Sequence, residues 1–380
     1  MGNSVGVPAP LIGIDGRALA GPMAGSGRYV SELCRALDLA LPRAHFAVFS
    51  NITITLPVHN ERWTLRQDTS FWGRLSPFMW YMLRAGHLAN EDKVTAFWGG
   101  SNFLPLGLAP RVHAVVTVLD VVHRMFPQSM GWKHRLAFEL FFRLSLQRAN
   151  IVTAISKGTS SRLAFFGYRT ADMIVRPGVD AGFKPAEAEA IAVMREVLGI
   201  RGRYLLSLST LEPRKNLQQL IAAYLAMHKA GELPDIDLVL VGQMGWKTGA
   251  LVDAIEKARH IGARIILTGH VPNGMLGALY TGAEVFLMPS IYEGFGLPIL
   301  EARMCGARVV ATDMPETREA GGDTVCYIEP TQAGIEGGIR RTLDLARPSQ
   351  LIDDDVPRWS SEGTILAHSL RLGASMQGLT

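Results

Sequence analysis

The sequence predicts an α/β protein built from two doubly wound, Rossmann-like domains in tandem. Its 380 residues are too many for one ordinary hydrophobic core. Short β-branched runs alternate with helical patterns along the chain, which is typical of parallel βαβ units. Glycine-containing loops follow several of the predicted strands, and sheets of this kind bind ligands beyond the carboxyl ends of their strands.

The first domain is predicted to span residues 1–185. Its first strand is Leu11–Asp15, and a glycine-rich loop leads from this strand into a helix. One face of that helix carries Val30, Leu33, Cys34, Leu37 and Leu41. Later strands of the same sheet are predicted at Val112–Leu119, Ile151–Ile155 and Met173–Val175.

The second domain is predicted to span residues 186–360. The boundary segment 176–202 combines a Pro-Gly turn, Pro185 at a helix start and an Ala/Glu-rich helix. A second series of strands follows near Tyr204–Ser209, Ile236–Val241, Arg264–Thr268, Val285–Met288 and Arg308–Ala311. We expect a helix in residues 361–380 to pack back on the first domain. Two such sheets would hold a ligand in an interdomain cleft.

Composition and charge restrict the classes of protein to which this chain can belong. With 48% hydrophobic and 19% charged residues the chain is expected to fold, and no apolar run is long enough to span a bilayer. The N-terminus lacks the pattern of a signal peptide, and Cys34, Cys305 and Cys326 lie in apolar patterns that disfavour disulfides or a zinc site. We therefore expect a cytoplasmic protein.

The first 185 residues are strongly basic, with 20 Lys and Arg against 11 Asp and Glu, a balance of +9. The remaining residues hold 18 and 23, a balance of −5. This asymmetry favours a polyanionic partner such as an anionic membrane surface or a lipid diphosphate, although chance scatter would look similar. No nucleic-acid-reading motif accompanies the charge, so we expect no nucleic acid.

The most informative motif is the segment 290–302. A predicted strand ends at Pro289, a glycine loop follows, and Pro298 suits the first turn of a helix. Backbone N–H groups of Gly294–Gly296 would lie beside the positive end of the helix dipole. Glu293 precedes the helix and Glu301 lies within it. A paired-carboxylate hydrolase is one interpretation, but carboxylates beside an anion-binding loop better suit hydrogen bonds to ribose and sugar hydroxyls.

A second motif, Pro213-Arg214-Lys215-Asn216, follows another predicted strand. Asn216 is interpreted as the N-cap of the next helix. Two adjacent cations at this position suit a diphosphate, because Arg binds bidentately and Lys acts as a point charge. A solvated Arg-Lys pair would give the same local pattern.

Together these motifs resemble the family-4 group of retaining glycosyltransferases, also called glycosyl transferases group 1, which have the GT-B fold. The spacing Glu293-x7-Glu301 and the Pro-Arg-Lys-Asn run carry the resemblance, which covers most of the chain. Further matching segments, in the family's order, are Gly25–Tyr29, Ser156, Val175–Asp180, Val241–Trp246, Gly269–Val271 and Glu316–Glu319.

The resemblance implies roles for individual residues. Arg214 and Lys215 would neutralise the donor diphosphate as it leaves, Glu301 would hold the ribose hydroxyls, and Glu293 would contact the transferred sugar. Main-chain contacts to phosphate, sugar or base are implied for Gly25, Gly27, Gly242, Val271, Gly294, Phe295 and Gly296.

One departure concerns the catalytic region of the first domain. Many relatives have His-Asp where this chain has Leu119-Asp120. Asp120 remains available, and His123 would supply the missing imidazole if it faces the site. A packing or hydrogen-bonded loop histidine is the alternative.

The expected function is a metal-independent hexosyltransferase without a cofactor. The resemblance favours mannose from GDP-mannose as the transferred sugar and a glycan or polyprenyl-diphosphate-linked acceptor in cell-surface polysaccharide assembly. Asp353–Asp355 is interpreted as a surface turn and not as a metal site. Two alternatives stay open, namely a non-catalytic sugar-nucleotide-binding subunit and a GT-B sugar-nucleotide epimerase.

Two aromatic and basic stretches, residues 63–87 and 132–148, suggest peripheral contact with an anionic membrane on the cytoplasmic side. Amphipathic helices packed in the core would show the same composition.

Overall fold

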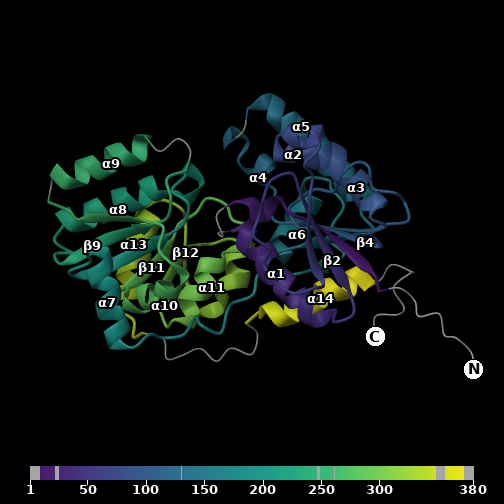
Figure 1. Ribbon diagram of the computed structural model, residues 1–380. Coiled ribbons are helices and arrows are strands. Elements are labelled where there is room, and N and C mark those ends of the chain that lie inside the picture. The colour runs from purple at the N-terminus through teal and green to yellow at the C-terminus, as the bar shows by residue number, and fades with distance from the viewer. Residues whose placement is uncertain are drawn as a thin grey trace, which may run out of the picture. The chain divides into compact units, whose positions relative to one another are not determined.

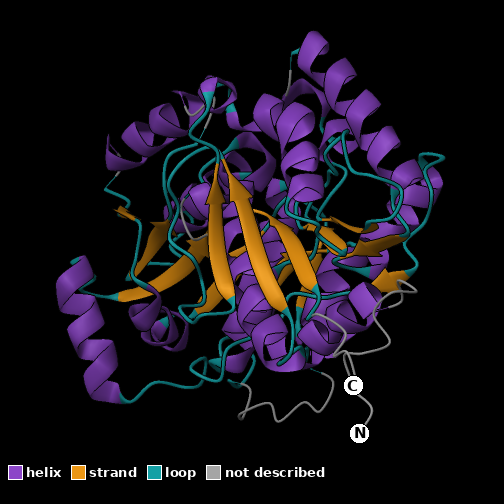
Figure 2. Ribbon diagram, turned by 45° about the vertical axis from the view of Figure 1, so that its right-hand side comes forward, coloured by secondary structure: helices purple, strands orange, loops and turns teal. Residues whose placement is uncertain are grey.

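The computed structural model describes residues 9–21, 25–129, 131–245, 249–260, 262–347 and 356–371. The chain divides into two compact units, which are Met1–Gly178 with Pro357–Thr380 and Val179–Val356. Figure 1 labels the elements of both units, and Figure 2 shows strands flanked by helices.

The first unit contains one parallel sheet, which has seven strands in the described residues, in the order β3-β2-β1-β4-β5-β6-β7. The order reverses between β1 and β4, so the loops after these strands diverge to opposite faces. The strands are β1 (Leu11–Asp15), β2 (His45–Ser50), β3 (Trp63–Gln67), β4 (Ala96–Gly99), β5 (His113–Val118), β6 (Ile151–Ala154) and β7 (Met173–Ile174). The α-helices are α1 (Ser26–Ala40), α2 (Pro77–Trp80), α3 (Gly86–Glu91), α4 (Val122–Met125), α5 (Trp132–Arg148), α6 (Lys157–Phe165) and α14 (Trp359–Arg371). Shorter 3-10 or π turns are η1 (Arg17–Ala20), η2 (Phe71–Arg74), η3 (Tyr81–Ala85) and η4 (Pro127–Ser129).

Helix α14 returns from the end of the chain to pack against α1 in the first unit. The two helices approach closely at Gly363, where a Cβ atom would lie 2.3 Å from the Cβ of Ala36. The buried Glu362 accepts hydrogen bonds from Arg176, from the backbone N–H at 2.8 Å and from Nε at 3.1 Å. The C-terminal helix is thereby tied to the strand-end segment that precedes Gly178.

The second unit contains a parallel sheet with six strands in the described residues, in the order β10-β9-β8-β11-β12-β13. Its strands are β8 (Arg203–Leu208), β9 (Ile236–Val241), β10 (Ile265–Gly269), β11 (Val285–Met288), β12 (Val309–Thr312) and β13 (Cys326–Ile328). Its helices are α7 (Ala188–Leu198), α8 (Leu217–Lys229), α9 (Gly249–His260), α10 (Asn273–Gly282), α11 (Leu297–Met304), α12 (Pro315–Gly321) and α13 (Gln332–Leu343), with the turns η5 (Pro213–Lys215) and η6 (Gly322–Thr324).

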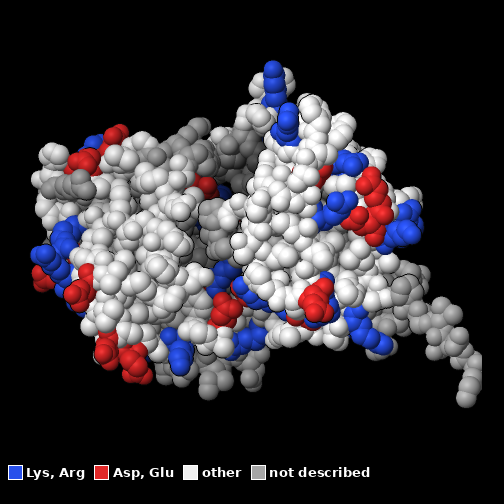
Figure 3. Space-filling model, viewed as in Figure 1, with Lys and Arg blue, Asp and Glu red and all other residues white. Residues whose placement is uncertain are grey.

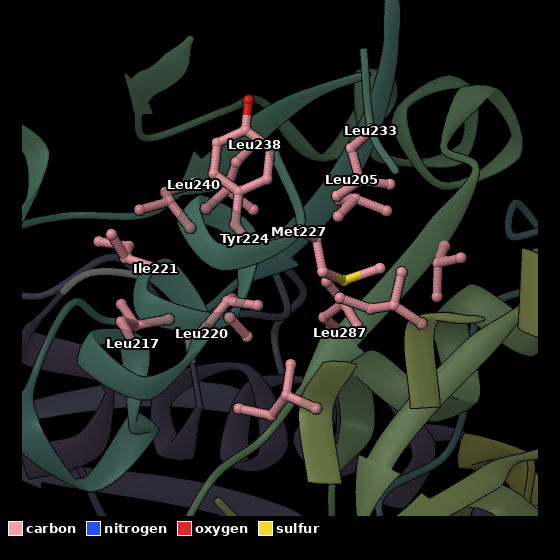
Figure 4. Packing of buried hydrophobic residues seen from close by; sticks show 14 of the residues in the cluster. Leu205, Leu217, Leu220, Ile221, Tyr224, Met227, Leu233, Leu238, Leu240 and Leu287 are labelled. Carbon is pink, nitrogen blue, oxygen red and sulfur yellow. The ribbon is translucent and has the colours of Figure 1, made fainter. Parts of the chain in front are cut away.

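The core of the second unit shows why its helices form where they do. The face of α8 that carries Leu217, Leu220, Ile221 and Tyr224 is buried against strands of the sheet (Figure 4). Since β8 and β9 are covered on both faces, they are almost continuously apolar, as expected for a parallel sheet.

The predicted fold class, two Rossmann-like doubly wound domains, is confirmed. The nine predicted strands correspond to observed strands to within one residue at each end. Four strands were not predicted, namely β2, β3, β4 and β13. No helix in the described part of the chain is both long and apolar enough to cross a membrane.

The structure divides the chain earlier than the predicted boundary after residue 185. The division lies at Gly178, because this residue packs against the segment that leads into α14. A Cβ atom at Gly178 would lie 2.3 Å from the backbone nitrogen of Trp359, so only glycine fits there. Residues 179–185 therefore belong with the second unit, and the C-terminal segment that begins at Pro357 belongs with the first.

Candidate functional site

In the second unit, the predicted donor-binding segments follow four neighbouring strands of one sheet. They come after β8, β9, β10 and β11, and these strands are parallel, so all four segments meet at one edge. The strand order reverses between β8 and β11. In open α/β sheets this reversal point is where ligands bind.

Arg214 and Lys215 lie in the turn η5, between the end of β8 and the start of α8. Asn216 ends this turn in the left-handed conformation, with φ of 59°. It occupies the N-cap position of α8, as predicted, but its side chain makes no capping hydrogen bond. Its Nδ2 instead donates to the carbonyl of Pro330 at 2.8 Å, which anchors the turn to the loop after β13.

Glu293, from the loop after β11, joins the two cations. Lys215 Nζ lies 2.6 Å from Glu293 Oε1, and Arg214 Nη1 lies 3.1 Å from Oε2. Arg214 also donates to the carbonyl of Tyr292 at 2.9 Å and to Glu212 Oε1 at 2.7 Å. Residues from the two strands at the reversal point therefore form one cluster of two cations and two carboxylates.

The cluster strongly favours an ionised Glu293. Burial alone would raise the pKa of this carboxyl, but Lys215 and Arg214 outweigh burial and lower its pKa to about 2. Burial lowers the pKa of Lys215, and the charge of Glu293 opposes that shift. We infer that Glu293 is a carboxylate at neutral pH and that the partly buried Lys215 is its counterion.

Glu301 lies in α11 and is almost fully buried. Its Oε2 accepts a hydrogen bond of 2.9 Å from the hydroxyl of Tyr280, which comes from α10. Helix α11 begins after Gly296, whose φ of 110° disfavours any side chain, and Phe295 of the same loop is buried. The predicted glycine loop and both predicted carboxylates thus flank the start of one helix.

Gly242 and Val271 follow the neighbouring strands β9 and β10. Gly242 has φ of 134°, and a Cβ atom there would lie 1.9 Å from the carbonyl oxygen of Ser209. The loops after β8 and β9 therefore touch through their backbones, which only glycine permits. Val271 is buried. Trp246, part of the motif around Gly242, lies outside the described residues, as do residues 353–355.

In the first unit, Gly25 and Gly27 lie at the start of α1, which follows β1. Gly25 is the N-cap residue, with φ of 54°, and its carbonyl accepts from the backbone N–H of Tyr29. Gly27 is buried within the first turn. Asp120 follows β5, at the same edge of the sheet, and its Oδ1 accepts from the backbone N–H of Val122 at 3.0 Å.

His123 does not lie exposed at this edge of the sheet. Its side chain is fully buried in α4, and its ring centre lies 4.5 Å from that of Phe138 and 5.0 Å from that of Phe142. Nε2 lies 3.2 Å from both the Tyr168 hydroxyl and Glu139 Oε2.

The surroundings of His123 favour a neutral imidazole. Burial is the main cause, and with nearby Arg124 it outweighs the opposing effect of Glu139, lowering the pKa of His123 to about 4. Glu139 already accepts hydrogen bonds from Tyr168, Arg124 and Arg143. This geometry favours the packing alternative for His123 over direct contact with a substrate.

A network that the sequence analysis missed lies where the strand order of the first unit reverses. Arg17, after β1, donates from Nη2 to Asp15 at 2.7 Å and to the carbonyl of Ser101 at 3.3 Å. Its guanidinium carbon lies 3.8 Å from the ring centre of Tyr81. The neighbouring Asn102, with φ of 66°, accepts at Oδ1 from the backbone N–H of Leu119 at 2.8 Å.

This network connects the loops after β1, β4 and β5, so it holds the backbone that carries Asp120. In the sequence, the feature that could have indicated this network is the spacing of Asp15 and Arg17 at the end of the first strand. Among the described residues, no group of three or more His, Cys, Asp or Glu side chains is placed to hold a metal ion.

Two solved structures share this fold. The sucrose-phosphate synthase from Thermosynechococcus elongatus superposes with a TM-score of 0.68 and 17% identity, over 95% of this chain and 94% of that one. WaaG, a glycosyltransferase involved in lipopolysaccharide biosynthesis, has a TM-score of 0.68 and 17% identity, over 96% of this chain and 97% of its own. At such identity these likenesses show the fold, which is GT-B.

Curated relatives are nearer in sequence. The O-antigen chain mannosyltransferase B of Escherichia coli is 29% identical over 81% of this chain and 84% of its own length. A GDP-mannose-dependent alpha-(1-6)-phosphatidylinositol monomannoside mannosyltransferase of Mycolicibacterium smegmatis is 30% identical, over 60% of this chain and 61% of that protein.

The fold, the edge site and these relatives define the chain as a glycosyltransferase. Residues 193–349, which lie in the second unit, match the family described as glycosyl transferases group 1. The matched range contains Arg214, Lys215, Glu293 and Glu301.

Proposed function

We propose that the chain transfers a hexose from a nucleoside diphosphate sugar to an acceptor hydroxyl, with retention of configuration. The second unit would bind the donor and the first unit the acceptor. The observation that carries the proposal is the cluster of Arg214, Lys215 and Glu293 at the reversal point of the second sheet. Two cations at this edge suit a diphosphate.

The chemistry requires stabilisation of the departing diphosphate. The bond between C1 of the sugar and the diphosphate oxygen breaks, and its electron pair leaves with the diphosphate. The acceptor oxygen bonds to C1 on the same face, and its proton passes to the departing diphosphate. Arg214 and Lys215 would offset the charge that develops there, and a well-placed group of this kind is typically worth about 10²–10³ in rate.

The carboxylates would orient the donor. Glu301, held by Tyr280, would accept hydrogen bonds from the ribose hydroxyls, and Glu293 would accept from the sugar. The diphosphate would replace Glu293 as the main counterion of Lys215, which leaves Glu293 available to the sugar. Because two side-chain cations would neutralise the diphosphate, we propose that the reaction needs no metal ion and no cofactor.

For the donor we propose GDP-mannose, and for the acceptor a growing glycan on a polyprenyl diphosphate at the cytoplasmic face of the membrane. The names of the relatives, an O-antigen chain mannosyltransferase and a GDP-mannose-dependent mannosyltransferase, support the donor and a role in surface polysaccharide assembly. The balance of +9 over residues 1–185 supports an anionic acceptor.

The first test is thermal melting of the purified protein with GDP, UDP, ADP and dTDP. A ligand at 100 times its dissociation constant stabilises the folded state by about 2.7 kcal/mol. We expect GDP to raise the melting temperature of the wild type and not of the variant Arg214→Ala/Lys215→Ala. The control Lys229→Ala/Lys257→Ala removes the same charge from exposed positions of the same unit and should keep the shift.

Each outcome identifies a different part of the proposal. In one outcome, another nucleotide raises the melting temperature of the wild type but not of the Arg214→Ala/Lys215→Ala variant. That result would support the diphosphate site and would show that the base of the donor is not guanine. A shift that survives in that variant refutes the assigned site. Incubation of the purified protein with GDP-mannose and a mannose-terminated acceptor, with and without EDTA, then tests transfer, the donor sugar and metal independence.

A further inference from the structure

Large apolar side chains are exposed on two segments of the first unit that are far apart in sequence. Phe71 and Trp132 expose 79% and 68% of their surface. The other members are less exposed but still well above the level of core residues. We call this set the apolar surface, and its members are Phe71, Trp72, Met79, Leu83, Trp132, Leu136 and Leu140.

The two segments lie against each other. The ring of Phe78 in α2 lies 5.8 Å from that of Phe141 in α5, and both helices pack on Phe103, which is 5.1 Å from Phe78 and 4.7 Å from Phe138. Figure 1 shows α2 and α5 side by side. The exposed residues therefore flank one aromatic junction of the unit.

The first turns of α5 are unusual for a helix of a folded domain. Every residue from 132 to 137 is exposed, so this part of the helix has no buried face. Trp132, Leu136 and Leu140 are spaced four residues apart and thus share one side of the helix. The predicted alternative, an amphipathic core helix, holds for the second half of α5, where Phe142 and Leu146 are buried, but not for the first half.

Charge around the apolar surface is mainly positive, and Glu139, which lies in α5 between Leu136 and Leu140, is paired with Arg124 and Arg143. Residues 69–90 and 121–138 contain no Asp or Glu. The basic side chains beside the apolar residues are Arg74, Lys133 and Arg135, and the Lys133 nitrogen lies 5.5 Å from the ring centre of Trp132. Figure 3 shows Lys and Arg projecting, without Asp or Glu beside them, at the end of the unit where α5 lies in Figure 1.

We propose that the apolar surface docks on an anionic lipid bilayer, with Trp132, Leu136 and Phe71 entering the headgroup boundary. Aromatic and aliphatic residues framed by Lys and Arg are the composition that such an interface takes up. A second copy of the chain fits less well, because a two-fold contact would bring the same basic side chains together. The inference deepens the proposed function, since a lipid-linked acceptor lies in that bilayer.

The experiment is flotation with vesicles of phosphatidylcholine alone or of phosphatidylcholine mixed with phosphatidylglycerol. We expect the full chain to float with the anionic vesicles and not with the neutral ones, and to bind less tightly as salt is raised. Each large apolar side chain removed should weaken binding roughly tenfold, so Trp132→Ala/Leu136→Ala should bind roughly a hundredfold more weakly.

Two matched controls test whether the location matters. Leu39→Ala/Phe165→Ala removes equally exposed apolar side chains from α1 and α6 of the same unit and should bind like the wild type. Lys133→Gln/Arg135→Gln should lose the preference for anionic vesicles, whereas Lys229→Gln/Lys257→Gln should keep it. Equal losses with the control variants would overturn the proposal.

Other occupants of the surface give other results. Absence of flotation together with a dimer in sedimentation velocity, which Trp132→Ala/Leu136→Ala dissociates, would replace the bilayer by a second copy. Melting with GDP is measured on the same samples. A retained nucleotide shift without flotation refutes only the surface, whereas flotation without any nucleotide shift refutes the donor site and leaves the surface in place.

Discussion

Replacement of His123 by Phe separates a packing role from a catalytic role for this residue. The imidazole is fully buried among Phe138, Phe142 and Tyr168, and its Nδ1 has no hydrogen-bond partner among the residues that the structure describes. Phenylalanine is a somewhat larger flat ring that keeps the aromatic packing and removes this unpartnered atom. Glu139 keeps its partners Tyr168, Arg124 and Arg143, so the variant leaves no buried charge unpaired.

The magnitude follows from the pKa of His123, which folding lowers from 6.5 to about 4. Between these values the unfolded chain binds a proton that the folded chain does not, so stability falls as the pH falls. A shift of about two and a half units is worth about 3 kcal/mol when it is lost completely, at about 1.4 kcal/mol per unit. At pH 7 the wild type retains this stability in full.

The assay is urea unfolding of wild type and His123→Phe from pH 7.5 to pH 4.5. We expect similar free energies of unfolding at pH 7.5 and a smaller loss for the variant on acidification, by up to about 3 kcal/mol at the lower end. Transfer activity at pH 7.5 should stay within a few-fold of wild type. A parallel loss of stability in both proteins, or a drop in activity of about 10²–10⁴, as for a general acid or base, would refute the packing role.

Three further predictions concern other parts of the chain. Glu293→Gln removes the carboxylate that faces the partly buried Lys215 and should destabilise the protein by about 1.5–3 kcal/mol in urea unfolding. GDP should then stabilise the variant more than the wild type, and an equal shift would show that Glu293 does not compete with the diphosphate. The wild-type contribution of this carboxylate, present above its ordinary pKa, should be lost as the pH falls towards about 2. Gly242→Ala should weaken nucleotide-induced melting shifts, because its φ of 134° and the adjoining backbone exclude a Cβ; an unchanged shift would argue against this loop in the donor site. Glu362→Gln weakens the tie to Arg176, so limited proteolysis should remove the C-terminal helix faster than in the wild type, and equal rates would contradict that tie.

Much of the fold was predictable because its signals are local. The apolar face of α1 and the β-branched runs of β1, β5, β9 and β11 repeat at helix or strand spacing within a few residues. The strands β2 and β4 were missed, since Phe46 and Trp98 stand in short segments without a clear pattern and are buried only by their neighbours in the sheet. Strand β13 has only three residues.

The candidate site likewise has one part that could be predicted from the sequence and one part that could not. Arg214 and Lys215 are adjacent in sequence, so their joint action on a diphosphate was predictable from one segment. Their contact with Glu293, 78 and 79 residues away, was not, because it depends on β11 lying next to β8 in the sheet. The network around Arg17 joins loops after three different strands, and the sequence spacing between those loops carries no signal of their contact.

By itself, the sequence determined the two-domain α/β class, the order of the motifs and the likeness to group 1 glycosyltransferases, because residue type and short spacing suffice for these. Only the tertiary structure decided that His123 is buried, that Gly178 packs against the returning chain, and that α2 and α5 meet at one aromatic junction. The physical reason is that burial and ion pairing depend on which distant segments become neighbours, and sheet order together with helix packing sets that.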